Sequence, residues 1–139
     1  FETNTPEDSL ISGEAVAGFM YSNQAVKGKA TDEKLEPVFP IEGMPIYIDC
    51  FVMSKDAPNK EGAYKFLNFL LQPEIGGRIA EITKFTSPNK AAEEFLTEDF
   101  KNNIMLNLPD DIVKNTSFYI NVENVLEEYE HIYSEFKMQ

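Results

Sequence analysis

The sequence predicts an α/β domain, because short apolar runs with strand character alternate along the chain with segments of helical period. The run MPIYIDCFVM over 44–53 alternates its side chains as a strand does, whereas residues 61–83 place apolar side chains three and four positions apart. At 139 residues the chain has about the length of one domain and can enclose a hydrophobic core. The few predicted strands make a thin sheet, and we expect other polypeptide segments to complete it.

The first third of the chain contains two predicted helices and two predicted extended segments. Residues 6–13 carry acids near their start and a glycine at their end, as a short helix does. Residues 15–21, AVAGFMY, form an apolar run suited to a buried strand, and Ser22 or Asn23 is a candidate N-cap of the next helix. Residues 35–40 alternate but contain two prolines, which predicts an edge strand or an extended connection.

The middle of the chain contains the clearest strand, over 44–53, and then two consecutive helices. Asn59 is a candidate cap for the first of these helices, and Pro73 ends it and opens the second. The apolar stripe of the first helix predicts core packing, and its members are Ala63, Tyr64, Phe66, Leu67, Leu70 and Leu71.

The last third of the chain begins with a loop over 84–89, KFTSPN, whose Asn89 can cap the helical segment after it. Residues 97–120 mix short helical pieces with loops. Residues 121–137 place apolar side chains three and four positions apart, which predicts an amphipathic terminal helix.

The charge of the chain is strongly acidic, with 24 Asp and Glu against 12 Lys and Arg and a formal net charge of −12. Such a surface repels nucleic-acid phosphates and anionic lipids, so no nucleic-acid partner is expected. The same charge is compatible with a cationic solute or simply with good solubility.

No apolar run approaches the roughly 18 to 20 residues of a membrane span, and no leader pattern opens the chain. Because the sequence starts at Phe1, we expect that it was cut from a longer protein. Whether a targeting signal lies upstream is therefore an open question. The single cysteine, Cys50, cannot form an internal disulfide, and its place on the apolar face of the 44–53 strand predicts a buried thiol.

Residue patterns typical of enzymes and metal sites are absent from the sequence. The one histidine, His131, lies among glutamates on the terminal helix, where a solvated side chain is the expected state. One histidine and one cysteine cannot supply the common zinc sets, the glycines lack a phosphate-binding pattern, and the acidic runs lack EF-hand spacing. We therefore expect no catalytic residue, no metal and no cofactor.

Asp49 is the one acid inside the apolar strand run. In a strand, Tyr47, Asp49 and Phe51 share one face, and the residues between them form an apolar face. An ionised carboxylate removed from water costs several kcal/mol unless a cation or hydrogen-bond donors compensate it. The alternatives are an acid at a strand end that accepts backbone hydrogen bonds, or one exposed at an edge.

Three stretches of the chain resemble the C-terminal segment of the bacterial spermidine/putrescine-binding proteins, the extracytoplasmic receptors of polyamine ABC transporters. The resemblance runs from about residue 9 to the end and is densest in NKEGAYKFLNFLLQPEI, a stretch shared with neighbouring solute-receptor families. The stretches are ISGEAVAGFMYSNQA, VFPIEGMPIYIDCFVMSKDAPNKEGAYKFLNFLLQPEIGGRIAEITKFTSPNKAA and LEEYEHIYSEFK.

The resemblance implies part of a type II periplasmic-binding-protein fold, in which two α/β lobes hold a ligand between them. Residues 1–38 would finish one lobe, residues 41–100 would return to the other, and residues 121–137 would form a terminal helix across both. It also implies a periplasmic or extracytoplasmic location, with membrane association through upstream sequence, and a membrane permease as partner.

The resemblance implies four ligand-binding residues, Tyr21, Tyr47, Asp49 and Phe85. The family usually has tryptophan at the first two positions and tyrosine at the fourth, so stacking here is weaker and the exact polyamine is open. Aromatic faces hold a methylene chain and carboxylates neutralise its ammonium ends. The alternatives are that the rings pack as core, with Phe85 the first candidate for plain packing.

Three hypotheses of function follow from these observations. The first is a polyamine receptor, the second a receptor of the same fold for another small solute, and the third a structural or interaction module without a ligand of its own. For the isolated segment we expect weak or undetectable polyamine binding, with self-association through exposed sheet edges as a further outcome.

Overall fold

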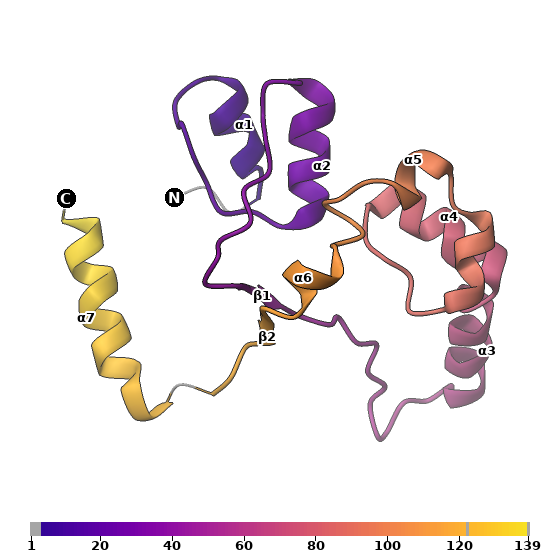
Figure 1. Cartoon of the computed structure of the whole chain (residues 1–139). Coiled ribbons are helices and arrows are strands. Elements are labelled where there is room, and N and C mark those ends of the chain that lie inside the picture. The colour runs from indigo at the N-terminus through magenta and orange to yellow at the C-terminus, as the bar shows by residue number, and fades with distance from the viewer. Residues whose placement is uncertain (1–3, 122, 139) are drawn as a thin grey trace.

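The computed structural model describes residues 4–121 and 123–138, which form helices around a small parallel sheet (Figure 1). The α-helices are α1 (Pro6–Ile11), α2 (Ser22–Thr31), α3 (Lys60–Leu70), α4 (Pro73–Thr83), α5 (Glu98–Lys101), α6 (Asp110–Val113) and α7 (Leu126–Lys137). The 3-10 helices are η1 (Lys90–Phe95) and η2 (Glu123–Val125), and the strands are β1 (Met44–Ile46) and β2 (Thr116–Phe118). The α/β class predicted from the sequence is confirmed.

The sheet pairs β1 with β2 in parallel, with Met44 opposite Thr116 and Ile46 opposite Phe118. Parallel neighbours need a long crossover, and α3 to α6 lie in that connection. The predicted strand over 44–53 ends at Ile46, and residues 47–53 continue without strand pairing. Strand structure requires a neighbour for its backbone hydrogen bonds, and of the residues in the predicted strand only 44–46 have one.

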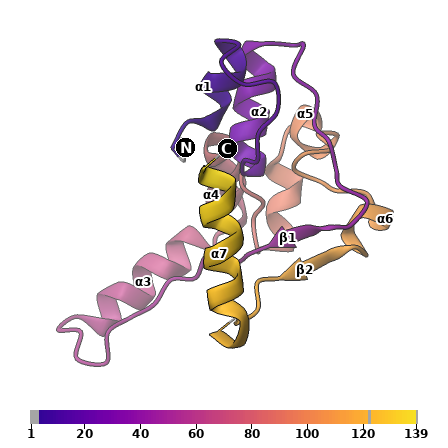
Figure 2. The same cartoon turned by 90° about the vertical axis from the view of Figure 1, so that its left-hand side faces the viewer.

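Helices α1 and α2 lie side by side in both views of the molecule (Figures 1 and 2). Gly28 allows this approach, because a Cβ atom there would lie 3.1 Å from the Cβ of Glu7. The buried Gln24 closes one end of the pair, since its Nε2 donates to the carbonyl oxygen of Asn4 at 3.1 Å.

The core lies between α4, η1 and the residues after them, and its buried apolar members are Ala80, Ala92, Phe100, Met105 and Leu106. Gly76 and Gly77 bring α4 against η1, because a Cβ on Gly77 would lie 2.7 Å from the Cβ of Phe95. Val26 of α2 packs against the same core cluster and joins the first helical pair to the body.

Several local predictions are confirmed at the ends of helices. Gly13 follows α1 with φ of 78°, and Asn59 caps α3 by accepting a hydrogen bond from the amide of Gly62 at 2.9 Å. Pro73 opens α4, and the side chain of Asn89 caps η1, which is a 3-10 helix. The terminal helix was predicted over 121–137, but α7 begins only at Leu126, after the 3-10 helix η2, and residue 122 lies outside the described residues. In Figure 1, α7 stands away from the other helices.

The N-cap of α2 is Tyr21, so the prediction of Ser22 or Asn23 was wrong by one or two residues. The amide of Tyr21 donates to Oε1 of Gln24 at 2.9 Å, and this contact places the N-cap at Tyr21, on the N-terminal side of both predicted positions. Residues 35–40 form the extended connection that the sequence allowed.

Three burial predictions were wrong. Residues 15–21 form no strand and leave Val16 and Phe19 exposed, α3 contains no buried residue, and Cys50 is exposed. These residues are exposed because the chain is not compact. Its accessible surface is 11518 Å², whereas a compact monomer of 15.8 kDa exposes roughly 7,300 Å². The described residues provide no second layer to cover these apolar faces.

Candidate ligand site

The rings of Tyr21 and Tyr47 lie against each other, with centroids 5.2 Å apart and planes tilted by 58°. Tyr21 is the N-cap of α2 and Tyr47 directly follows β1, so two separate segments supply the pair. Tilted pairs at this separation have a favourable aromatic geometry. Tyr21 is 53% exposed and Tyr47 is 41% exposed, so much of each residue stays open to solvent.

Asp49 lies two residues after Tyr47 and is exposed. The pKa of Tyr47 is raised, first by partial burial of the phenol, then by the negative charge of Asp49 and by Tyr21. The carboxylate of Asp49 therefore acts electrostatically on the phenol of Tyr47. We call these three residues the Tyr21–Tyr47–Asp49 cluster.

The two alternatives for Asp49 differ in their hydrogen bonds. No main-chain amide within residues 4–121 and 123–138 donates to its carboxylate, and no Lys or Arg of those residues pairs with it. The arrangement matches an exposed acid, and within the described residues its carboxylate has no cationic partner.

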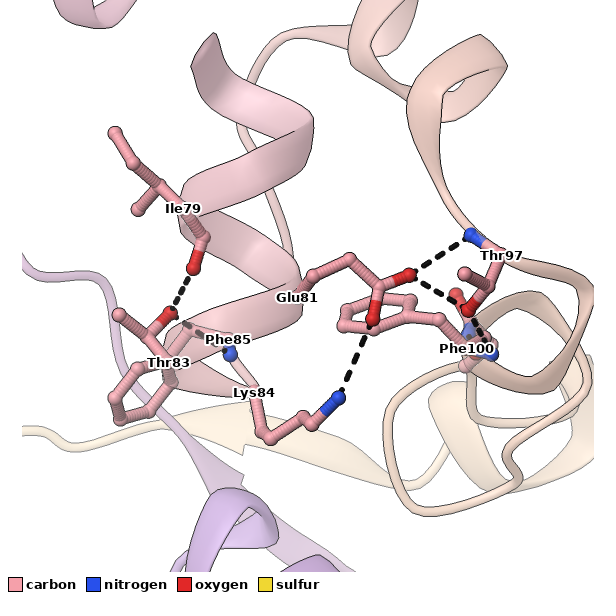
Figure 3. Close-up of polar contacts among 8 residues, drawn as sticks. Ile79, Glu81, Thr83, Lys84, Phe85, Thr97 and Phe100 are labelled. Atoms are coloured by element: carbon pink, nitrogen blue, oxygen red, sulfur yellow. Dashed lines mark hydrogen bonds and ion pairs between the residues drawn. The ribbon is translucent and has the colours of Figure 1, made fainter. Parts of the chain in front are cut away.

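Phe85 follows the C-terminal end of α4 and is 38% exposed. Among the described residues, no ring contact joins it to either tyrosine of the cluster. In Figure 3 its side chain points away from the contacts between Glu81 and Thr97. The structure thus brings together three of the four residues predicted for the site and holds the fourth in a separate loop.

Gln24 is a residue that the sequence analysis missed. It fixes the backbone of Tyr21 through the hydrogen bond from the Tyr21 amide, and it is buried itself. A Gln three positions after an N-cap is the second half of a capping box, so this spacing is the signal that predicts its role.

The rest of the described chain offers little other ligand chemistry. It contains no group of three or more His, Cys, Asp or Glu side chains able to hold a metal ion. An open hollow of about 500 Å³ lies beside the start of α7, lined by Glu123, Val125, Leu126, Glu127 and Glu128, and none of these residues belongs to the cluster.

His131 is exposed on α7, with Nε2 3.4 Å from Oε1 of Glu135, as a solvated histidine should be. No helix in 4–121 or 123–138 is both long and apolar enough to cross a membrane.

The family model for bacterial extracellular solute-binding proteins matches residues 2–107, which is most of the chain. This chain belongs to that family. It is 28% identical over 137 residues to the spermidine/putrescine-binding periplasmic protein of Escherichia coli K12, an alignment that covers 99% of this chain and 39% of that protein. The resemblance predicted from the sequence motifs is confirmed.

Two further relatives of this chain have names that specify polyamines. A putrescine-binding periplasmic protein of Pseudomonas aeruginosa is 30% identical over 108 residues, covering 73% of this chain and 29% of that protein. A norspermidine sensor of Vibrio cholerae is 33% identical over 70 residues, covering 50% of this chain and 20% of that protein. The chain thus spans well under half the length of each of these relatives.

Proposed function

We propose that this chain forms part of a polyamine receptor, in which the Tyr21–Tyr47–Asp49 cluster contacts one ammonium end of the ligand and the methylenes beside it. The observation that carries the proposal is the placement of a carboxylate next to a ring pair built from two separate segments. The names of the relatives support the choice of ligand, because spermidine and putrescine are alkyl chains that end in ammonium groups.

The chemistry of such a ligand matches the three side chains. A cation over an aromatic face contributes about 0.5–1 kcal/mol at an exposed site and about 2 kcal/mol when water is excluded. A hydrogen bond from an ammonium group to a carboxylate adds about 1.5–3 kcal/mol. A neutral solute gains neither term and leaves Asp49 without a counter-charge, which favours cationic ligands.

The complete receptor would have two lobes of the type II periplasmic-binding fold. Residues 1–38 would belong to one lobe, residues 41–100 to the other, and residues 121–137 would form a helix across both. The connection over 32–43, which contains no helix or strand, supports a crossing between lobes at this point. Phe85 would reach the ligand when the lobes close by a hinge motion.

The receptor would act outside the cytoplasm, in the periplasm or its equivalent. It would be associated with the membrane through sequence that precedes this chain in the longer protein. We propose that it delivers its ligand to the membrane permease of an ABC transporter, and that this delivery requires no catalysis and no cofactor.

Calorimetric titration of a receptor of the relatives' full length with spermidine and putrescine tests the proposal. Heat of binding is expected for at least one polyamine, and Asp49→Asn should weaken binding about 10- to 100-fold through the lost charge-assisted hydrogen bond. Asp56→Asn is the matched control, because Asp56 is an exposed acid in the next turn of the same segment. Absence of heat with both polyamines, or equal affinity of the Asp49 variant and the parent, would contradict the proposal.

A receptor of the same fold for another small solute is the second candidate function. It is favoured by the match to a family described only as bacterial extracellular solute-binding proteins, which does not specify the ligand. A thermal-shift screen discriminates the two, because a ligand that binds only the folded state raises the melting temperature. A shift with a non-polyamine solute, without one from spermidine, putrescine or norspermidine, would favour this candidate.

A further inference from the structure

The loop that carries Phe85 leaves α4 through an uncommon backbone conformation. Lys84 ends the helix with φ of 59° and ψ of 32°, and it is the one non-glycine residue with positive φ in the described chain. Side chains of L residues disfavour this left-handed region, so other contacts must hold Lys84 there. The direction in which Phe85 departs depends on those contacts.

The backbone of Phe85 itself is tied to the last turn of α4. Its amide donates to Oγ1 of Thr83 at 3.3 Å, and that hydroxyl donates to the carbonyl oxygen of Ile79 at 2.8 Å (Figure 3). These bonds fix the start of the loop but do not by themselves favour the left-handed conformation of Lys84.

The side chain of Lys84 is held by two further groups. Its Nζ donates to Oε2 of Glu81 at 3.3 Å and lies 5.7 Å from the centroid of the Phe100 ring. The side chains of Lys84 and Glu81 are 33% and 24% exposed, so this ion pair is partly shielded from water. Phe100 belongs to the core, which gives the ammonium group a fixed aromatic surface.

Glu81 in turn is fixed by the start of α5. Its Oε1 accepts hydrogen bonds from the amide of Thr97 at 2.8 Å and from the Thr97 hydroxyl at 2.7 Å. Thr97 is the N-cap of α5 and accepts from the amide of Phe100 at 3.2 Å. Figure 3 shows these contacts as one continuous network from the core to Lys84.

We propose that Glu81 is a positioning residue for Phe85: through Lys84 it holds the left-handed turn that sets where the Phe85 ring points. The inference rests on the proposed function, in which Phe85 contacts the polyamine. The far end of the loop is also held, because Nδ2 of Asn89 donates to the carbonyl oxygen of Leu71 at 2.6 Å. A loop held at both ends needs little ordering when the ligand binds, which increases affinity.

A single tryptophan at position 85 tests this positioning in the full chain, because the natural sequence contains no tryptophan. In a Phe85→Trp background, Glu81→Gln should lower the anisotropy of the tryptophan and increase its acrylamide quenching several-fold. Glu98→Gln is the matched control, since Glu98 makes a similar ion pair with Lys101 at 3.0 Å three residues away, and it should change neither signal. All signals are measured well below the melting temperature. Under these conditions, if Glu81 only stabilised the fold, Glu81→Gln would lower the free energy of unfolding but would not make the side chain at position 85 more mobile.

Conservative substitution provides a second measurement. Thr97→Ser keeps both hydrogen bonds to Glu81 and should retain the parent signals, whereas Thr97→Val loses the hydroxyl and should behave like Glu81→Gln. If Phe85→Trp does not fold, amide hydrogen exchange of residue 85 in the natural chain replaces fluorescence. Its rate should rise several-fold in Glu81→Gln and stay unchanged in Glu98→Gln.

Affinity measurements on the complete receptor separate this inference from the proposed function. Glu81→Gln should weaken spermidine or putrescine binding several-fold, and this effect should vanish in a Phe85→Ala background. Unchanged mobility of residue 85 in Glu81→Gln, with polyamine binding intact, overturns the inference alone. Loss of polyamine binding in the parent receptor overturns the proposed function, whereas the mobility data still decide whether Glu81 positions the loop.

Discussion

The ring centroid of Tyr21 lies 5.2 Å from that of Tyr47, although all of α2 and the extended connection to β1 separate the two residues along the chain. The contact depends on where α2 starts, because Tyr21 is its N-cap, and on where β1 ends, because Tyr47 follows its last residue. Asp49 adds a negative charge beside this pair. The ionisation of Tyr47 is therefore a direct probe of the candidate site.

Asp49→Asn should lower the pKa of Tyr47 without returning it to its ordinary value. The charge of Asp49 is only the second cause of the raised pKa, and partial burial, the larger cause, remains in the variant. Ultraviolet absorbance of tyrosinate during a pH titration measures the change, and Tyr47→Phe identifies which of the 6 tyrosines is responsible. An Asp49→Asn titration identical to that of the parent would show that the carboxylate does not act on the ring.

The same raised pKa predicts how stability depends on alkaline pH. The folded state holds the Tyr47 proton more tightly than the unfolded chain does, so this contribution is complete below the unfolded pKa and is lost as pH rises through the folded pKa. The free energy of unfolding should thus fall less steeply above about pH 10 in Tyr47→Phe than in the parent. Urea unfolding at a series of alkaline pH values measures the difference.

Glu81 should stabilise the fold at neutral pH and lose that effect in acid. Burial alone would raise its pKa, but hydrogen bonds from the side chain and backbone of Thr97 and from Lys84 leave the pKa below its ordinary value. Its contribution is therefore present above the unfolded pKa and is lost as pH falls through the folded pKa. Glu81→Gln should cost about 1.5 kcal/mol at neutral pH, as expected for hydrogen bonds to a partly exposed charged group.

Urea unfolding of the parent and of Glu81→Gln across pH 7 to about 3 checks this prediction. The two unfolding free energies should converge as the carboxylate becomes protonated. Glu98→Gln, which removes a more exposed carboxylate from a similar ion pair, should cost much less at neutral pH. A constant difference between parent and Glu81→Gln across the whole range would show that ionisation of Glu81 plays no part.

Glu7→Met should stabilise the pair formed by α1 and α2. Glu7 is only 8% exposed, and within the described residues its Oε2 has no hydrogen-bond partner. Burial of an unsatisfied polar group costs about 1–3 kcal/mol, whereas the acid gains less than about 1 kcal/mol from the helix N-terminus. A gain of about 1 kcal/mol in the free energy of unfolding is therefore expected.

Thermal and urea unfolding measure the effect, and Asp8→Asn is the control because Asp8 is the adjacent, exposed acid of the same helix turn. Asp8→Asn should change stability little or lower it slightly. A clear loss of stability in Glu7→Met would mean that the carboxylate has a partner or a packing role that the described contacts do not include.

Local signals predicted several helix ends, although not the start of α2, because a cap depends on a few neighbouring atoms. Asn59 accepts from the amide of Gly62, and Pro73 stops one helix and opens the next for reasons contained in a short stretch of sequence. Burial could not be predicted in the same way. Cys50 and Phe66 have apolar patterns around them, yet both are exposed, because cover must come from residues distant in sequence.

The candidate site shows the same division. The strand pattern alone singled out Asp49 and placed Tyr47 on the same face, whereas Tyr21 and Phe85 were predicted only from the family resemblance. The contact between Tyr21 and Tyr47 depends on the path of the chain between them, which no local spacing encodes. The hydrogen bond from the Thr97 hydroxyl to Glu81 spans 16 positions in the sequence, so no local pattern predicts it. The sequence indicates only the ion pair of Glu81 with Lys84, which lie three residues apart.

The isolated 139-residue chain should self-associate more strongly as salt concentration rises. Its accessible surface of 11518 Å² includes many exposed apolar side chains, and β1 and β2 each have an edge without a described neighbour. The net charge of −12 opposes association, and raising salt from about 0.1 to about 1 M shortens the screening length from about 10 to about 3 Å. Light scattering across this salt series should therefore show a rising mass.

Phe66→Ser on α3 should reduce the rise and Asn68→Ser, an exposed polar position on the same helix, should not. A clean monomer at every salt concentration would mean that the exposed apolar faces are tolerated in solution without a partner.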